Sequence, residues 1–224
     1  MIKKLIQFIQ NQKHYLSSDR YIAFLKSKGI KIGNNCIALY PRSISIDVSR
    51  PTLLEIGDNV FLHKGTTIMT HDFASYVFVN KYNEFIPSHG KVKIGNNVWF
   101  GMNCTVLKGV TIGDNCIIGI GSIVTKDIPA NSVAIGNPAK VVCSLDEYFE
   151  KRKKQYLKEC VDYAKSIVLT EKGNSINNES FSDDYILFVD GSNYQDYPYP
   201  YSNVFNKEQF EHCNTSVKIY RAKS

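Results

Sequence analysis

A six-residue spacing of apolar side chains constrains this chain more than any other feature. Every sixth residue from 32 to 68, and again from 94 to 130, is apolar at thirteen of fourteen positions, and Arg50 is the exception. This period fits neither a helix nor a long alternating strand. It is typical of a short strand and a turn that repeat. Three such units close a triangular coil, and stacked coils bury a core that no single unit could bury. The positions are Ile32, Ala38, Ile44, Arg50, Ile56, Leu62, Ile68, Ile94, Phe100, Val106, Ile112, Ile118, Val124 and Ala130.

The residues between these positions support the same interpretation. A small or β-branched residue comes four positions after many of the apolar ones, as at Cys36, Cys104 and Cys116. Pairs of Asn or Asp, such as 96–97 and 114–115, supply side chains that tolerate a left-handed backbone in turns. We therefore expect an all-β solenoid in which these cysteines are reduced and structural.

The two series are out of phase, so the chain must leave the coil between them. The segment 73–91 is rich in aromatic residues, does not follow the repeat and is longer than an ordinary connection. Long excursions from a rigid scaffold are usually functional. The break in the pattern at Arg50–Pro51 predicts a second, smaller bulge.

These patterns divide the chain into three regions. Residues 1–30 are predicted to form a helical cap, with one helix over 2–13 and another that begins with Ser18 as its N-cap and stops at Gly29. Residues 31–142 form the repeat region with its excursion at 73–91. In 143–224 we expect a helix over 145–168, a polar loop over 171–182, and an aromatic tail that packs on a neighbour.

Composition narrows the class of protein. No run approaches the ~18 apolar residues of a membrane span, and the N-terminus does not resemble a signal peptide, so we expect a cytoplasmic protein. The net charge of +6 is concentrated in residues 1–31, whereas a nucleic-acid-binding protein would spread cations and aromatics over a face. A solvated helix face accounts for these cations; attraction to an anionic membrane surface is the alternative.

Residues 91–142, KVKIGNNVWFGMNCTVLKGVTIGDNCIIGIGSIVTKDIPANSVAIGNPAKVV, closely resemble the last coils of hexapeptide acyltransferases. That family includes the galactoside and maltose O-acetyltransferases and those of capsule and O-antigen synthesis. The resemblance implies a left-handed parallel β-helix, acetyl-coenzyme A as acyl donor with no metal, and a homotrimer with active sites between subunits. The acceptor would be a sugar or glycan.

Acetyl transfer to a hydroxyl requires a base, and histidine titrates near neutral pH. His71 lies in IMTHDF, where the first series gives way to the excursion, and matches the position of the family's catalytic histidine. Asp72 would point to the other face of a strand, so a backbone carbonyl or Glu84 is expected to orient the imidazole. His89 is the reserve candidate for the base, and His63 is interpreted as structural or as lining the cleft.

The resemblance also assigns the donor site. Trp99 walls the acyl slot, the N–H of Met102 faces the thioester oxygen, and Lys140 meets the adenosine phosphates. Three further residues line the pantetheine arm: Ile120, Thr125 and Lys126.

The acceptor is expected to be bound by the excursion, through Phe73, Tyr76, Tyr82, Glu84 and His89. The aromatic rings could stack on a pyranose or pack into a trimer contact. O-acetylation of a polysaccharide, lipid-linked glycan or nucleotide sugar is the leading hypothesis, and N-acetylation of an amino sugar would use the same base and donor. Remote alternatives are a zinc enzyme similar to γ-class carbonic anhydrases and a non-catalytic binding protein.

Overall fold

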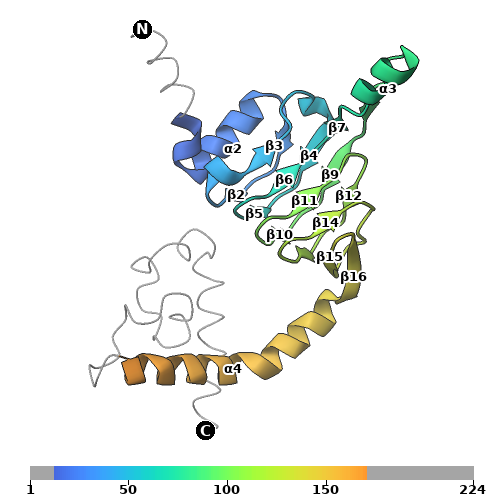
Figure 1. Cartoon of the computed structure of the whole chain (residues 1–224). Coiled ribbons are helices and arrows are strands. Elements are labelled where there is room, and N and C mark those ends of the chain that lie inside the picture. Colours follow the sequence, from blue (N-terminus) through green and yellow to red (C-terminus); the bar gives the residue numbers. More distant parts are fainter. Residues whose placement is uncertain (1–12, 171–224) are drawn as a thin grey trace. The chain divides into compact units, whose positions relative to one another are not determined.

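The computed structural model describes residues 13–170, and its strands form three parallel sheets that wind into a triangular coil (Figure 1). Sheet A has the order β1-β4-β9-β12, sheet B the order β16-β15-β13-β10-β5-β2, and sheet C the order β14-β11-β6-β3. Because the chain visits the three sheets in turn, each coil adds one strand to each sheet. The predicted β-solenoid is confirmed as a parallel three-sheet β-helix.

The strands are short, as the hexad pattern predicts. Sheet A contains β1 (Lys31–Ile32), β4 (Leu54–Ile56), β9 (Val92–Ile94) and β12 (Thr111–Ile112). Sheet B contains β2 (Ile37–Ala38), β5 (Phe61–Leu62), β10 (Val98–Phe100), β13 (Cys116–Ile118), β15 (Ser132–Gly136) and β16 (Ala139–Ser144). Sheet C contains β3 (Ser45–Ile46), β6 (Thr67–Ile68), β11 (Thr105–Val106) and β14 (Ile123–Val124).

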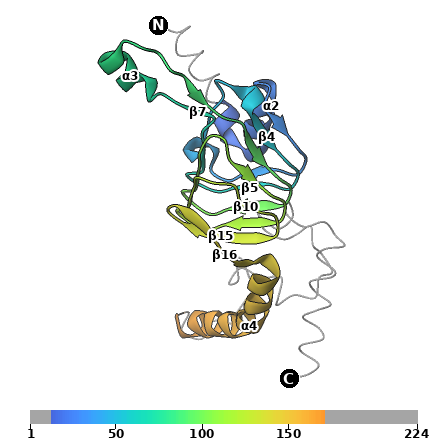
Figure 2. The same cartoon turned by 90° about the vertical axis from the view of Figure 1, so that its right-hand side faces the viewer.

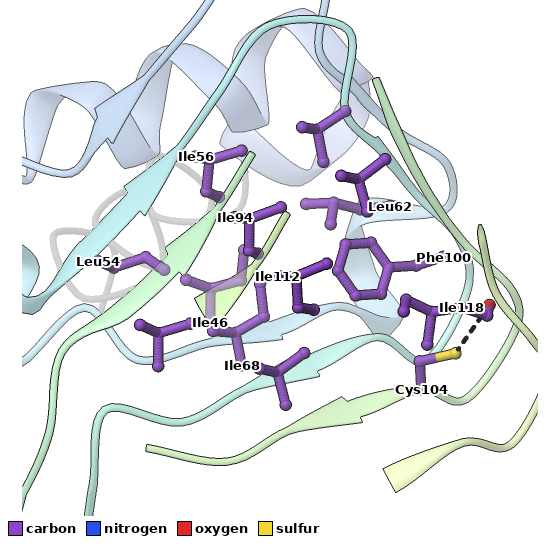
Figure 3. Packing of buried hydrophobic residues seen from close by; sticks show 14 of the residues in the cluster. Ile46, Leu54, Ile56, Leu62, Ile68, Ile94, Phe100, Cys104, Ile112 and Ile118 are labelled. Atoms are coloured by element: carbon purple, nitrogen blue, oxygen red, sulfur yellow. Dashed lines mark hydrogen bonds between the residues drawn. The ribbon is translucent and has the colours of Figure 1, made fainter. Parts of the chain in front are cut away.

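The large residue of each unit fills the interior of the coil (Figure 3). Ile56, Ile94 and Ile112 stack in register across sheet A, and Phe100 in sheet B is fully buried. Cys104 and Cys116 are buried beside this stack as free thiols, and burial raises the pKa of both. The hydrophobic column supplies the stabilisation that single units lack.

The two members of each Asn or Asp pair have different roles at one corner of the coil. The second member adopts a left-handed backbone, with φ of 54° at Asn97 and 56° at Asn115, and the amides of successive coils bond at 2.9 Å. The first member caps the neighbouring coil, because Asp114 Oδ1 accepts the N–H of Asn96 at 2.6 Å. Polar turn residues thus hold adjacent coils at a fixed spacing.

A helix covers the first coil. η1 (Lys13–Leu16) leads into α2 (Ser18–Ser27), which buries the predicted face of Tyr21, Ile22 and Leu25. The predicted N-cap was wrong by one residue, because Ser17 accepts the N–H of Arg20. The Ser18 hydroxyl instead accepts the N–H of Ala38 at 2.9 Å and so ties the helix to β2.

The chain leaves the coil where the phase shift predicts. Spacing between paired residues in sheet A is 18 from Ile94 to Ile112 but 38 from Ile56 to Ile94. The extra residues form β7 (His71–Asp72), α3 (Ser75–Tyr82) and β8 (Ser88–His89), and β7 pairs with β8 in antiparallel fashion. The excursion, for which no secondary structure was predicted, is a helix on a two-stranded stalk that projects from the coil (Figure 2).

Two 3-10 turns interrupt the first coils, η2 (Pro41–Ser43) and η3 (Pro51–Leu53), and the second is the bulge predicted at Arg50–Pro51. At the other end, β16 pairs with β15 in antiparallel fashion and extends to Ser144, two residues beyond the predicted end of the repeats. α4 (Leu145–Thr170) follows. The boundary between the two compact units of the chain lies within this helix, after Lys151. The Ser144 hydroxyl and Glu147 carboxylate cap the start of α4 reciprocally.

The predictions for residues 2–12 and for the region after 170 lie outside the described residues. Within 13–170, no helix is both long and apolar enough to cross a bilayer.

Candidate active site

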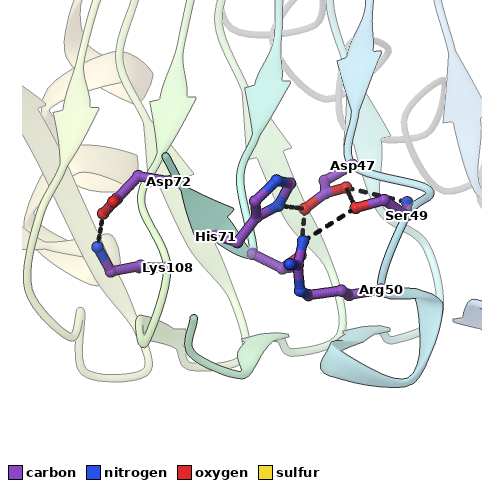
Figure 4. A network of polar contacts seen from close by, with 7 residues as sticks. Asp47, Ser49, Arg50, His71, Asp72 and Lys108 are labelled. Carbon is purple, nitrogen blue, oxygen red and sulfur yellow. Dashed lines mark hydrogen bonds and ion pairs between the residues drawn. The ribbon is translucent and has the colours of Figure 1, made fainter. Parts of the chain in front are cut away.

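His71 and Asp47 meet where two strands of sheet C end. Asp47 follows β3 directly, and His71 comes three residues after β6, which pairs with β3. His71 Nδ1 lies 2.5 Å from Asp47 Oδ2 (Figure 4). The side chain of His71 is 28% exposed and that of Asp47 only 11%. The imidazole is therefore accessible to solvent, whereas the carboxylate is nearly buried. We call Asp47, Thr70 and His71 the histidine corner.

The Asp47 carboxylate is held in its ionised form. Ser49 donates to Oδ1 from its N–H at 3.0 Å and from its hydroxyl at 2.6 Å, and the Thr70 hydroxyl donates to Oδ2. Burial by itself raises the pKa of Asp47, but the hydrogen bonds from Ser49, Thr70 and His71 outweigh it and keep the pKa well below its usual range. An ionised carboxylate only accepts, so in the neutral form of the ring the proton is on His71 Nδ1 and the lone pair is on Nε2.

Asp47 was not among the residues predicted from the sequence. Neither a backbone carbonyl nor Glu84 orients the imidazole; Asp47, 24 positions earlier, does so because strand pairing brings it into the adjacent coil. The spacing of the coils could have identified it. Paired residues of β3 and β6 are 22 positions apart, so Asp47 lies beside the residues that lead from β6 to His71.

Asp72 faces away from His71, as expected from strand alternation. It accepts hydrogen bonds from the Ser88 hydroxyl at 3.1 Å and from the Lys108 ammonium of the next coil. These contacts tie both strands of the stalk to the coil. On the opposite face of the stalk, the register pairs His71 with His89, which is exposed. The reserve candidate for the base therefore lies next to the first one.

The other predicted acceptor residues lie on the excursion and do not contact His71. Their side chains are exposed, at 66% for Phe73, 68% for Tyr76 and 58% for Tyr82, and Glu84 is also exposed. The excursion thus presents aromatic rings to solvent next to the histidine corner.

Four apolar side chains gather at the corner between sheets B and C, which we call the slot corner: Trp99, Met102, Ile120 and Ile135. Trp99 points outward from β10 and is 38% exposed, as is Met102. Ile120 comes one coil later and is 63% exposed, and Ile135 packs on Gly119. Lys140 is opposite Ile135 in the β15–β16 hairpin. Four predicted donor residues, Trp99, Met102, Ile120 and Lys140, thus lie at neighbouring positions of adjacent coils, and Ile135, which was not predicted, lies among them.

The backbone at the slot corner also has a free donor. The Met102 carbonyl accepts the N–H of Gly121 at 2.8 Å, whereas no described residue accepts a hydrogen bond from the Met102 N–H. Thr125 and Lys126 are separated from this group, because they follow β14 at the end of sheet C where the histidine corner lies.

One chain therefore holds the two parts of the predicted site at different corners. Met102 precedes β11 and His71 follows β6, and these two strands pair in parallel. The width of sheet C separates the imidazole from the slot corner. Within residues 13–170, no three His, Cys, Asp or Glu side chains are placed to hold a metal ion. His63 packs near Phe61 and Tyr40, and its Nδ1 accepts the N–H of Lys64.

Comparison with known proteins decides the family. Residues 91–126 match the model described as bacterial transferase hexapeptide (six repeats). Protein CapG of Staphylococcus aureus is 38% identical over 175 residues, which cover 76% of this chain and 92% of CapG. The chain belongs to the hexapeptide-repeat acetyltransferase family. It is an acetyltransferase of that family.

Other relatives match this acetyltransferase over shorter stretches. The galactoside O-acetyltransferase of Escherichia coli K12 is 37% identical over 126 residues, 56% of this chain and 59% of the relative. A structure of a hexapeptide-repeat acetyltransferase from Vibrio cholerae, complexed with acetyl-coenzyme A, is 27% identical over 52% of this chain and 60% of that one, with a TM-score of 0.38.

Proposed function

We propose that this acetyltransferase transfers the acetyl group of acetyl-coenzyme A directly to a sugar hydroxyl, with His71 as general base. The acceptor would belong to a cell-surface polysaccharide, a lipid-linked glycan or a nucleotide-sugar precursor. The Asp47–His71 pair carries the proposal, because a partly exposed imidazole backed by an ionised carboxylate is suited to remove a hydroxyl proton. The name of the galactoside O-acetyltransferase relative supports a sugar as acceptor.

In this mechanism the oxygen of the acceptor hydroxyl attacks the thioester carbonyl, and His71 Nε2 accepts the proton of that hydroxyl. Asp47 fixes the tautomer and orientation of the ring and stabilises the imidazolium that forms. Thr70 and Ser49 keep Asp47 ionised and in place. The imidazolium then returns the proton to the departing thiolate sulfur.

Acetyl-coenzyme A is a substrate, and the slot corner suits it. Trp99, Met102 and Ile120 offer an apolar surface for the pantetheine arm, and the unpaired N–H of Met102 is available to a developing oxyanion. Lys140, exposed on β16, offers a charge for phosphate.

Two observations support a trimer whose sites lie between subunits. First, one chain leaves the imidazole and the slot at different corners, so a second copy must bring them together. Second, the outer face of sheet B is apolar, with Phe61, Trp99 and Ile117 in register, whereas the outer face of sheet A carries Glu55 and Lys93. An exposed apolar face of this kind is typical of a subunit contact.

The first experiment measures transfer to a panel of sugars, including an amino sugar, for wild type and His71→Ala. We expect the variant to remain folded and trimeric while kcat falls by a factor on the order of 10²–10⁴. His63→Ala is the matched control and should stay within about threefold of wild type. Near wild-type turnover by His71→Ala would remove this residue from the mechanism.

The second experiment tests the division of the site between subunits. His71→Ala chains and Trp99→Ala chains, each inactive alone, are unfolded together and refolded as mixed trimers. If each site takes His71 from one copy and Trp99 from another, some interfaces regain both residues, and activity returns to a fraction of wild type. If activity does not return in mixtures verified by native mass spectrometry, the site lies within one chain.

A further inference from the structure

Arg50 is the one residue that breaks the hexad series, and the proposed function gives it no role. The structure does not keep this series, because Ile46 and not Ile44 pairs with Ile68, so η2 has already shifted the frame by two residues before Arg50. Here the 3-10 turn η3 follows at once, and Leu54 is the next side chain to enter the core, with 0% exposure. Arg50 itself takes φ −132° and ψ 65° and is only half-buried. Arg50 therefore lies outside the core, between β3 and η3.

The guanidinium lies beside the histidine corner (Figure 4). Arg50 Nη1 donates to the Ser49 hydroxyl at 3.2 Å, and that hydroxyl donates to Asp47, which holds His71. Arg50 is thus joined to the proposed base through two side chains.

The charge on Arg50 has no counter-ion within residues 13–170. Asp47 is already occupied by Ser49, Thr70 and His71, and it makes no ion pair with Arg50. The other nearby carboxylate, Asp72, is taken by Lys108. A half-buried guanidinium with open donors presents a planar fork that suits carboxylate or phosphate.

We propose that Arg50 binds an anionic group of the acceptor, a carboxylate or a phosphate, and so makes this enzyme selective for acidic sugars or sugar phosphates over neutral ones. This inference rests on the proposed function, since it names the class of acceptor used at the His71 site. Arg50 would act in binding and selectivity, while proton transfer remains with His71.

The experiment compares kcat/KM for matched acceptors that differ in one charged group. One pair is galacturonate and galactose, and the other is N-acetylglucosamine 1-phosphate and N-acetylglucosamine. We expect wild type to prefer the charged member of at least one pair, and the preferred pair identifies carboxylate or phosphate. For that pair Arg50→Gln should lower the charged-to-neutral ratio by about 10–100-fold, the range for a hydrogen bond to a charged group.

Three further arms make the result specific. Arg50→Lys should recover part of the ratio, and Arg42→Gln, an exposed arginine in η2 without contact to Asp47 or His71, should leave it unchanged. Equilibrium binding of the preferred charged acceptor, measured by calorimetry, should weaken in Arg50→Gln by the same factor and should weaken in wild type as salt increases.

The possible outcomes distinguish a failure of the Arg50 role from a failure of the proposed function. Equal use of charged and neutral acceptors by wild type, or an equal loss on both by Arg50→Gln, would overturn the role of Arg50 while His71-dependent transfer stands. Absence of His71-dependent transfer to every acceptor would overturn the proposed function itself.

Discussion

The coils and the excursion use similar aromatic and aliphatic residues in opposite ways. Phe100 in the coil is fully buried, whereas Tyr76 and Phe85 on the excursion are 68% and 63% exposed. In the coils each residue has a counterpart one turn away that fixes its place. The excursion has no such counterpart and is anchored by its stalk, where Lys108 and Ser88 bind Asp72. The repeat thus specifies the scaffold, and the proposed base lies where the repeat is interrupted.

If this comparison is right, small changes in the coil should cost stability more than large ones on the excursion. Gly113→Ala should have the largest effect, because a Cβ there would lie 2.4 Å from the backbone N of Ala130 in the next coil. We expect a loss of about 3 kcal/mol in the free energy of unfolding, measured by urea denaturation at fixed protein concentration. Gly109→Ala is the control: its Cβ would meet nothing within 4 Å, although φ is +81°. The left-handed backbone alone should cost about 1 kcal/mol. Equal losses would contradict the close packing of coils.

Asp47→Asn tests the link between the two regions, since the carboxylate belongs to the coil and the imidazole to the excursion. An amide can present an N–H to His71 and disturb its tautomer, so we expect kcat to fall by about 10–100-fold, a loss on the order of 2 kcal/mol in transition-state stabilisation. Asp72→Asn, on the other face of the stalk, should change kcat by less than about threefold. A larger effect at Asp72 than at Asp47 would reverse our assignment of the two carboxylates.

The same variant has a pH signature. The folded pKa of Asp47 is lowered, so its contribution to stability is complete above the unfolded pKa of about 4 and is lost as pH falls through the folded value. The melting temperature of wild type should therefore fall more steeply below about pH 4 than that of Asp47→Asn. Parallel melting curves over that range would count against the ionised carboxylate.

Tyr76→Ala should have the smallest effect on stability, within about 0.5 kcal/mol, because the ring is mostly exposed. If the ring stacks on the acceptor, KM for the sugar rises several-fold while the oligomeric state is unchanged. A smaller oligomer than wild type, measured by sedimentation, would instead place the ring in a subunit contact.

The sequence was sufficient for the coils because their information is periodic. The hexad positions, the Asn turns and the change of phase all follow from local spacing, and α2 follows from its apolar stripe and Gly29. The helix α3 was missed because neither its first residues nor its last ones carry a strong start or stop signal before Asn83. The role of Ser18 was misassigned because a hydroxyl at a helix start can cap its own helix or a neighbouring strand, and only the three-dimensional contact decides.

The active-site partners divide along the same line. His71 was predicted as the base because it stands in a motif at the end of a series. Asp47 and Arg50 were not assigned roles, because their places depend on how many residues η2 and η3 add to the first coil. Together these two turns set a spacing of 24 residues between Ile32 and Ile56 instead of 18. Sequence distance alone does not place a side chain across such an irregular coil.

The bond from Ala38 N–H to the Ser18 hydroxyl has a consequence for the whole molecule at high concentration. A solenoid made of parallel strands ends in unpaired backbone donors, and such an end invites another copy to add its own strands and grow into a filament. By filling one of these donors from a helix that is also packed over the first coil, the chain blocks growth in that direction. Strand addition at this end of the coil is thereby disfavoured.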